Sequence, residues 1–198
     1  MTSLVLASGS SIRAQLLKRC NVAFEVEIAR VDEEMIKDSM LAQSAKPRDI
    51  ADALAEAKAR KVANRRSAQM VLGCDQILEF EGTVISKCDT SADALDLLKR
   101  MRGSEHRLLS AAVIYDATKP VWRHIGQVRL FMHDLSDAFL EDYISRNWDS
   151  VSNAVGCYKL EEEGPRLFSR IEGDHFNVLG LPLLELLSYL RLRGTLQG

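Results

Sequence analysis

The stretch from residue 3 to residue 13 reads Ser-Leu-Val-Leu-Ala-Ser-Gly-Ser-Ser-Ile-Arg, an apolar run followed by a turn of small residues. Ser3–Ala7 predicts a short buried strand, because its apolar residues are continuous and a turn signal follows. Ser8–Ser11 predicts the start of a helix, since serine is a preferred N-cap residue and Ile12 and Leu16 then share one helix face. This order of strand, loop and helix is typical of an α/β fold.

Further along the chain, predicted strands and helices alternate until a predicted hairpin interrupts them. The other predicted strands are Phe24–Ile28, Met70–Gly73 with Asp75 at its end, and a hairpin of Leu108–Tyr115 and Val121–Met132. The other predicted helices begin at Pro47, Asp89–Ser91, Ser136 and Pro182, the last ending near Gly194. Because an antiparallel hairpin joins the alternating elements, we expect a mixed sheet flanked by helices. A ligand is expected in the crevice above the strand ends.

Length and composition favour an ordinary globular protein. The 198 residues, 46% hydrophobic and 27% charged, fit one domain or a small two-lobed one, and no linker marks a boundary, so we take residues 1–198 as a single domain. A net charge of −2 gives no attraction to polymeric nucleic acid or an anionic membrane. The first apolar run, Leu4–Ala7, lacks the length and basic flank of a signal segment, so a cytoplasmic protein is expected.

The cysteines and histidines show no metal-binding or disulfide pattern. The four cysteines, at positions 20, 74, 88 and 157, form no C-x-x-C pair, and the four histidines have no ligand spacing relative to them. We therefore interpret the thiols as small buried or half-buried side chains in a reducing compartment.

Three groups of polar residues are candidates for chemistry. The turn Ser8–Arg13 offers backbone N–H groups at a helix N-terminus, which suits phosphate oxygens, although serines also cap helices without any ligand. Arg13 strengthens the phosphate hypothesis, because a cation gains nothing from the positive end of a helix dipole. Asp32–Glu34 is either a divalent-cation site or a solvated loop. Asp75 is either a base with a raised pKa at a strand end or a capping residue.

Single cations complete this set. Lys58 lies beside the apolar stripe of its helix, and Lys87 and Lys159 stand in otherwise uncharged surroundings. Each alone is typical of a surface lysine. Collected in one crevice with metal-holding acids, they would suit phosphoryl chemistry, in which catalysis is mostly positioning and charge stabilisation.

The order of these segments resembles the Maf nucleotide pyrophosphatases over nearly the whole chain. The segments are Leu6–Arg13, Asp32-Glu33, Ala57-Lys58-Ala59, Gly73-Cys74-Asp75, Ser86-Lys87, Arg102–His106 and Gly180–Leu183. The resemblance implies a two-lobed α/β fold like that of Maf and ITPase proteins, with a mixed, curved sheet and a deep cleft. It also implies hydrolysis of a nucleoside triphosphate to the monophosphate and pyrophosphate with Mg²⁺ or Mn²⁺, and leaves a homodimer open.

The resemblance also implies roles for individual residues. Asp75 matches the catalytic acid that accepts the proton of water, Glu33 a cleft acid near the metal, and Lys87 a catalytic cation. We take Glu33 and Asp75 as the metal ligands, and the predicted substrate-binding residues are Ser8, Ser10, Arg13, Lys58, Gln76, Lys159 and Glu161. The chain departs from the usual family pattern at Ile12, where a further cation is common, and at Cys88, where proline is common.

The preferred base and the activity itself have alternatives. Gln76 after the catalytic acid, and Glu161 in a later segment, resemble the 7-methyl-GTP branch of the family. A physical argument supports this branch, because the Glu161 carboxylate could accept hydrogen bonds from guanine N–H groups and attract a cationic base. The alternative branch prefers dTTP and UTP. Two other hypotheses are a non-catalytic nucleotide-binding regulator of septum formation and a phosphatase that releases orthophosphate. The physiological role is either nucleotide-pool housekeeping or the control of division.

Overall fold

The computed structural model describes residues 4–196, which form strands, helices and one short 3₁₀ segment. In chain order the elements are β1 (Leu4–Leu6), α1 (Ser11–Arg19), β2 (Phe24–Val26), α2 (Glu33–Ala42), α3 (Pro47–Ala63), β3 (Met70–Phe80), β4 (Thr83–Ile85), α4 (Ser91–Met101), β5 (Glu105–Asp116), β6 (Lys119–Met132), α5 (Asp137–Val151), η1 (Gly164–Leu167), β7 (Phe168–Glu172), α6 (His175–Val178) and α7 (Leu183–Leu192). The chain is therefore α/β, as the sequence predicts.

The strands form one mixed sheet. Its order is β2-β1-β3-β5-β6-β7, with β4 paired to β3 beside this path. Strand β1 runs parallel to both β2 and β3, whereas β4 on β3 and β7 on β6 are antiparallel. The prediction of a mixed sheet flanked by helices is confirmed, and β5 and β6 form the expected hairpin with a turn at residues 117–118.

Two sequence predictions need correction. Strand β3 does not end at Asp75 but continues to Phe80, because Ile77, Leu78 and Phe80 extend its buried pattern and pair it with β4. Asp75 therefore lies inside a strand. The segment Asp32–Glu34 is not a plain loop, since Asp32 caps α2 by accepting a hydrogen bond from the Met35 backbone N–H at 3.0 Å. The predicted strand at Ser3–Ala7 is β1, and Ser3 lies outside the described residues.

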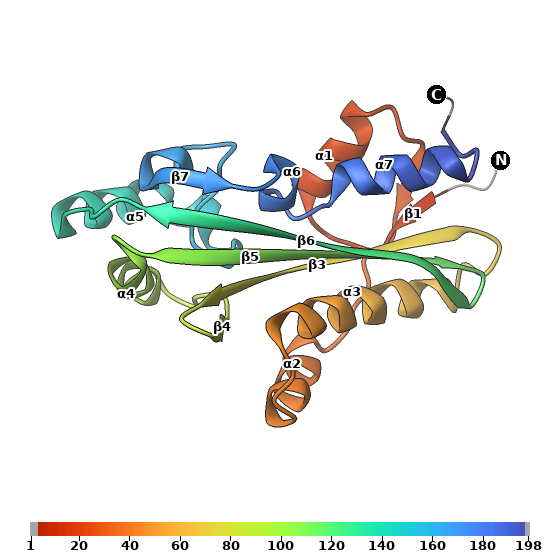
Figure 1. Ribbon diagram of the computed structural model, residues 1–198, viewed down its shortest axis with the longest axis horizontal. Helices are drawn as coiled ribbons and strands as arrows, with labels where there is room; N and C mark the ends of the chain where they lie inside the picture. Colours follow the sequence, from red (N-terminus) through yellow and green to blue (C-terminus); the bar gives the residue numbers. More distant parts are fainter. Residues whose placement is uncertain (1–3, 197–198) are drawn as a thin grey trace. The chain divides into compact units, whose positions relative to one another are not determined.

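The chain divides into two compact units. The first comprises residues 1–76, 109–126 and 175–198. Within it, α3 lies on one side of β1 and β3, and α1 and α7 lie on the other (Figure 1). The α1 and α7 side holds a core that includes Leu4, Leu72, Leu17 and Leu186. This packing fixes both faces of β3, on which Asp75 and Gln76 point in opposite directions.

The second unit comprises residues 77–108 and 127–174. Its helices α4 and α5 contact each other, and each buries one apolar face. A buried aromatic cluster joins β5, the segment after α5 and β7. His106 Nε2 is 2.7 Å from Tyr158 Oη, and both rings contact Phe168. The unit is thus a packed body with its own core.

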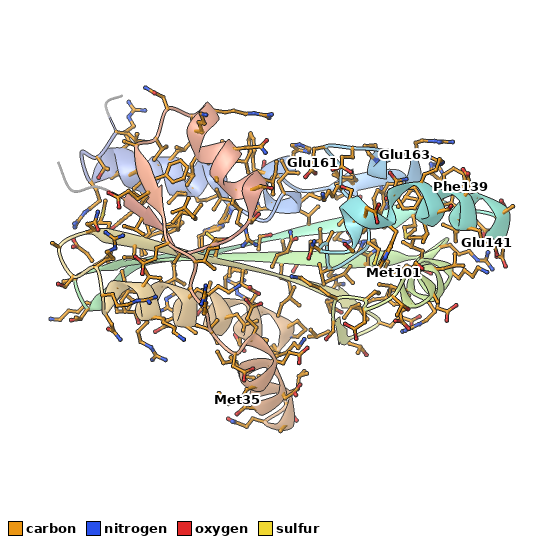
Figure 2. All side chains as sticks on the ribbon, turned by 180° about the vertical axis from the view of Figure 1, so that it is seen from behind. Met35, Met101, Phe139, Glu141, Glu161 and Glu163 are labelled. Carbon is orange, nitrogen blue, oxygen red and sulfur yellow. The ribbon has the colours of Figure 1, made fainter. Side chains whose placement is uncertain are left out.

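Helix α2 is the most exposed of the described helices. None of its residues is buried, and Met35, labelled in Figure 2, is 64% exposed. Its packing contacts are with α3. Among residues 4–196, no helix is both long and apolar enough to cross a lipid bilayer.

Candidate active site

The candidate site of the first unit depends on a close approach between helix α3 and strand β3. A Cβ atom at Gly73 would lie 2.2 Å from the Ala55 carbonyl oxygen and 2.5 Å from the Ala59 backbone nitrogen. Only glycine therefore permits this spacing, because those neighbours are backbone atoms that cannot turn aside. The contact brings the α3 residue Lys58 against Asp75, which lies on the same face of β3 as Gly73.

Lys58 bridges two carboxylates. Its Nζ donates to Asp75 Oδ1 at 2.6 Å and lies 2.8 Å from Glu33 Oε1. The side chains of Lys58 and Asp75 are only 11% and 9% exposed, whereas that of Glu33 is 47% exposed. The structure thus brings together a buried acid, a buried cation and a second acid open to solvent.

Burial determines the protonation behaviour of Asp75. Removal from water raises the pKa of this carboxyl, while the charges of Lys58 and Arg13 and the Lys58 hydrogen bond lower it, and burial outweighs them. The nearby Glu33 carboxylate raises the pKa further. A carboxylate with a raised pKa is a better proton acceptor than an ordinary aspartate, which suits a general base.

Arg13 lies buried beneath the turn that precedes α1. Its Nε donates to the Gly180 carbonyl at 2.7 Å, and its Nη1 donates to Ser8 Oγ at 3.2 Å and to the Cys74 carbonyl at 3.1 Å. Gly180 has a positive φ of 88°, and a Cβ there would lie 2.9 Å from Arg13 Nη2. Arg13 therefore joins α1, β3 and the segment before α7, and its charge reaches Asp75.

The serines of the same turn shape the start of α1. Ser10 is the N-cap and accepts a hydrogen bond from the Arg13 backbone N–H at 3.5 Å, and Ser8 Oγ accepts one from the Ser10 N–H at 3.3 Å. The predicted helix start is confirmed. Helix capping engages the Ser10 hydroxyl, whereas Ser8 Oγ accepts from the Ser10 N–H and from Arg13. Phosphate binding by this turn stays a prediction.

Gln76 is held by the protein itself. Its side-chain nitrogen donates to Ser110 Oγ at 3.0 Å and to the carbonyls of Asn177 and Val178 at 2.9 and 3.0 Å. Neither these partners nor Gly180 were among the site residues predicted from the sequence. Gly180 could have been found from the sequence, because it begins the segment Gly180-Leu181-Pro182 that resembles the family, whereas nothing in the sequence marks Ser110 or Asn177.

The remaining predicted residues belong to the second unit. Lys87 is exposed in the segment between β4 and α4. Lys159 is half-buried, donating to Ser150 Oγ at 2.7 Å and to Glu162 Oε1 at 3.2 Å. Glu161 is exposed in the turn before η1 (Figure 2). Of the ten predicted residues, seven therefore belong to the first unit and these three to the second.

The donor set near Asp75 fits a magnesium-type cation and does not fit zinc. Within residues 4–196 no three His, Cys, Asp or Glu side chains gather to hold a metal ion. Two carboxylates, Glu33 and Asp75, do reach the same Lys58 ammonium, and one of them is open to solvent. Mg²⁺ is commonly held by one or two carboxylates together with waters and substrate phosphates.

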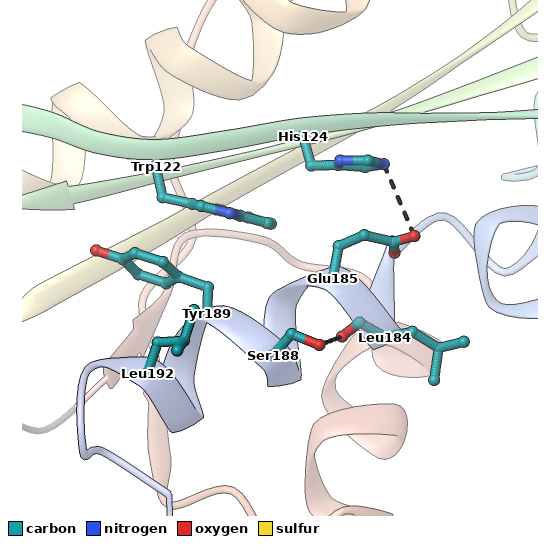
Figure 3. Close-up of a pocket in the computed structure, with 7 residues that line it drawn as sticks. All are labelled: Trp122, His124, Leu184, Glu185, Ser188, Tyr189 and Leu192. Carbon is teal, nitrogen blue, oxygen red and sulfur yellow. Dashed lines mark hydrogen bonds and ion pairs between the residues drawn. The ribbon is translucent and has the colours of Figure 1, made fainter.

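A separate pocket of about 420 Å³ lies elsewhere in the first unit, between β6 and α7 (Figure 3). Trp122 stacks on Tyr189 with ring centroids 5.4 Å apart, and His124 Nε2 lies 3.9 Å from Glu185 Oε1. None of the ten predicted site residues lines this pocket.

In an α/β protein, a buried lysine and arginine beside two carboxylates define a site suited to an anionic, phosphate-bearing ligand with a divalent cation. The family model described as "Maf-like protein" matches residues 3–193. The chain belongs to the Maf family.

Several curated proteins resemble this chain over almost its whole length. A protein of Ruegeria pomeroyi named nucleoside triphosphate pyrophosphatase is 62% identical, covering 98% of this chain and 97% of its own. A protein of Caulobacter vibrioides with the same name is 45% identical over 99% and 98% of the two chains. A protein of Rhizobium meliloti named 7-methyl-GTP pyrophosphatase is 40% identical over 98% of each chain.

Proposed function

We propose that this protein is a nucleoside triphosphate pyrophosphatase that hydrolyses the bond between the α and β phosphates, giving a nucleoside monophosphate and pyrophosphate. The observation that carries the proposal is the buried Lys58 bridging Asp75 and Glu33 in a chain of the Maf family. The names of its relatives support the same activity. We propose that it acts in the cytoplasm, where nucleoside triphosphates are made and used.

Asp75 is the proposed general base. Its raised pKa favours taking a proton from the water that attacks phosphorus, and Lys58 at 2.6 Å holds the carboxylate in one orientation. Negative charge develops on the phosphate oxygens as pyrophosphate leaves, and the cations of Lys58 and Arg13 stabilise it. Lys87 is proposed as a further cation that binds a phosphate group of the substrate.

Glu33 and Asp75 are the proposed holders of a divalent cation, Mg²⁺ or Mn²⁺. When bound, such a cation neutralises phosphate charge and orients the triphosphate. The half-exposed Glu33 is open to a hydrated ion, and both acids now share the charge of Lys58. Lys58 therefore keeps the two acids compensated when no ion is bound, which lowers the cost of burying Asp75.

The base preference is the second part of the proposal. Glu161, exposed in the second unit, offers a carboxylate to the N–H edge of guanine and to a cationic methylated ring. This chemistry favours 7-methyl-GTP, the compound named in the Rhizobium meliloti relative. The Gln76 amide nitrogen donates to Ser110 and to the carbonyls of Asn177 and Val178, and the proposed part of Gln76 in substrate binding rests on the resemblance alone.

The test is a turnover screen of the purified protein with Mg²⁺ or Mn²⁺ against dTTP, UTP, CTP, GTP and 7-methyl-GTP, resolving pyrophosphate from orthophosphate. We expect pyrophosphate, and we expect Asp75→Asn to abolish its release while the melting temperature and nucleotide binding persist, since asparagine can still accept from Lys58. Orthophosphate as the only product would indicate a phosphatase instead. Binding without turnover in the wild type would indicate a regulator of the kind linked to septum formation.

A further inference from the structure

The segment at residues 152–163, between α5 and η1, carries two predicted substrate-binding residues, Lys159 and Glu161. Residues 152–163 belong to no helix or strand, so the repeating backbone hydrogen bonds of those elements do not hold their shape. Cys157 and Tyr158 are nevertheless buried, at 0% and 6% exposure. Contacts of these buried residues must therefore fix the segment, because a connection without regular structure is otherwise mobile.

Tyr158 is enclosed on several sides. Its Oη is 2.7 Å from His106 Nε2, and its ring meets the Phe168 ring edge-on with the centroids 4.8 Å apart. The backbone of Gly156 covers a further side, since a Cβ atom there would lie 2.3 Å from Tyr158 Cε1 and 2.9 Å from Leu78 Cδ1. Only glycine permits this close approach of the backbone to the ring. Tyr158 is therefore held by β5, by β7 and by its own segment.

Burial determines the charge of His106 and the direction of its hydrogen bond. The residue is 1% exposed, and burial lowers its pKa to about 4, so the imidazole is neutral at pH 7 with one donor and one acceptor nitrogen. Nδ1 is buried and has no hydrogen-bond partner among the described residues. If Nε2 donated to Tyr158, both Nδ1 and the hydroxyl proton would lack a partner in this part of the chain, whereas an accepting Nε2 leaves only Nδ1–H unpaired. The Tyr158 hydroxyl is therefore the donor.

The pair of His106 and Tyr158 suits positioning better than stabilisation. A buried polar group without a partner is destabilising, and two apolar side chains of similar shape would leave no such group. A hydrogen bond has a preferred length and direction, however, so it fixes the place of Tyr158 more narrowly than apolar packing alone.

The position of Tyr158 is passed on to the two site residues through the backbone. Lys159 follows Tyr158 directly, and its carbonyl accepts from the backbone N–H groups of Gly164 at 3.0 Å and Glu162 at 3.3 Å. These bonds close the chain from 159 to 164 into a turn, and Glu161 lies within it. A displacement of Tyr158 therefore moves the backbone that carries both Lys159 and Glu161.

We propose that His106 and Tyr158 are positioning residues that place Lys159 and Glu161 for nucleotide binding. The inference rests on the proposed function, because it takes Lys159 and Glu161 as groups that bind the nucleoside triphosphate. His106 and Tyr158 are buried and act through the turn, and the ends of the two site side chains make the contact.

Four variants of the full chain separate positioning from stability. Tyr158→Phe and His106→Leu each leave the other partner without its hydrogen bond, so each should lower the melting temperature by several degrees. His106→Gln keeps an acceptor oxygen near the place of Nε2 and should behave as the wild type. The double variant of His106→Leu with Tyr158→Phe removes both polar groups, so its melting temperature should return to within about 2 °C of the wild type.

The deciding measurement is KM and kcat with the best nucleoside triphosphate from the turnover screen. In both single variants and in the double variant we expect KM to rise about fivefold while kcat stays within about twofold, because binding groups are displaced and the reacting groups are not. His106→Gln should keep the wild-type KM. A KM that returns to the wild-type value in the double variant, together with the melting temperature, would show a structural role only and overturn the proposal. An unchanged KM in every variant, or a fall in kcat alone, would also overturn it.

Tyr115→Phe is the matched control. It removes the hydroxyl of a buried tyrosine in the first unit, where Oη donates to Glu56 Oε1 at 2.8 Å. Its melting temperature should fall while KM stays unchanged, and a KM raised as much as in Tyr158→Phe would contradict the proposal.

A separate outcome concerns the proposed function. A wild type that hydrolyses no triphosphate would reject that function, and the dissociation constants of 7-methyl-GTP and UTP, measured by calorimetry, then take the place of KM. A weaker affinity in the double variant would still support positioning by His106 and Tyr158. Equal affinities, or a wild type that binds neither nucleotide, would overturn it.

Discussion

The predicted site residues of the two units differ in how the protein holds them. In the first unit Arg13, Lys58 and Asp75 are each less than a tenth exposed and make short polar contacts with other parts of that unit. In the second unit Lys87 and Glu161 are exposed, and Lys159 is half-buried beside Glu162. The first group has one geometry before any ligand binds, whereas Lys87 and Glu161 are exposed and keep side-chain freedom.

We propose that the fixed residues act on the reacting phosphate and that the exposed residues bind the rest of the ligand. Groups that act on the reacting phosphorus gain from being fixed in advance, because a fixed charge needs no reorganisation during the reaction. Groups that recognise the rest of a ligand can be ordered on binding, at a cost of about 0.5–1.5 kcal/mol for each long side chain. Changes in the first unit should therefore reduce kcat, and changes in the second should alter KM and base preference.

The largest effect is expected from Lys58→Met. The change removes the cation that bridges the two acids, so we expect kcat/KM to fall by roughly 10³-fold and stability to fall by about 3 kcal/mol as Asp75 loses its partner. Because Lys58 lowers the pKa of Asp75, the acid limb of the kcat/KM profile should also move to higher pH. The limb reports the pH at which the base becomes protonated.

The matched control is Lys61→Met, on the same helix but exposed. It should leave both kcat/KM and the pH profile unchanged. If Lys58→Met raised KM without lowering kcat, Lys58 would resemble the second-unit residues, and the contrast between the two units would fail.

The next effect tests the spacing of α3 and β3 through Gly73→Ala. The added methyl would meet backbone atoms of Ala55 and Ala59, so the helix must shift, at a cost of roughly 1–3 kcal/mol and a melting temperature lower by about 3–10 °C. Moving Lys58 away from Asp75 should reduce kcat/KM by about 100-fold. Gly9→Ala is the control for stability, since its nearest neighbour would be Ile28 Cδ1 at an ordinary 3.5 Å. Unchanged activity in Gly73→Ala would show that the spacing does not position Lys58.

These residues also show how far the sequence alone could be interpreted. The helix starts at Ser10 and Ser136 and the capping box of Thr90 with Asp93 follow local rules, so the helices there were predictable. The short strands β4 and β7 were not predicted, because Thr83–Ile85 and Phe168–Glu172 show neither the continuous apolar run of β1 nor the alternation of β2. The bridge that Lys58 makes between Glu33 and Asp75 depends on tertiary packing at Gly73, which no local rule predicts. Only the resemblance to a family placed Glu33 and Asp75 in one site.

The hydrogen bonds of Gln76 could not be predicted from the sequence. Its position after Asp75 predicts contact with the substrate, and this stays a prediction, whereas its hydrogen bonds to Ser110 and to the segment before α7 were not predicted. Alternation along an extended strand places neighbours on opposite faces, so Asp75 and Gln76 face different surroundings. The continuation of β3 to Phe80 was the missing information, because a strand that ended at Asp75 would have left Gln76 free to turn.

A smaller effect is expected from Lys87→Ala in the second unit. Removing one exposed cation from a phosphate group should raise KM roughly tenfold with little change in kcat, since a charge-assisted contact contributes about 1.5–3 kcal/mol. The difference from wild type should shrink as salt is added, because exposed charges are screened. Lys119→Ala, which removes an exposed lysine of the first unit, is the control. A fall in kcat with unchanged KM would place Lys87 with the fixed groups.

The smallest effect, and the sharpest test of base recognition, is expected from Glu161→Gln. Glutamine keeps the size and one acceptor oxygen but loses the charge, so the attraction to the positive ring of 7-methyl-GTP should weaken while contacts with neutral bases change little. Because Glu161 is exposed, water screens this attraction, and we expect the ratio of kcat/KM for 7-methyl-GTP over UTP to fall only several-fold. Measuring both substrates on one protein preparation cancels any change in fold or active fraction. An unchanged ratio would remove Glu161 from base selection, with the first-unit residues keeping their proposed roles.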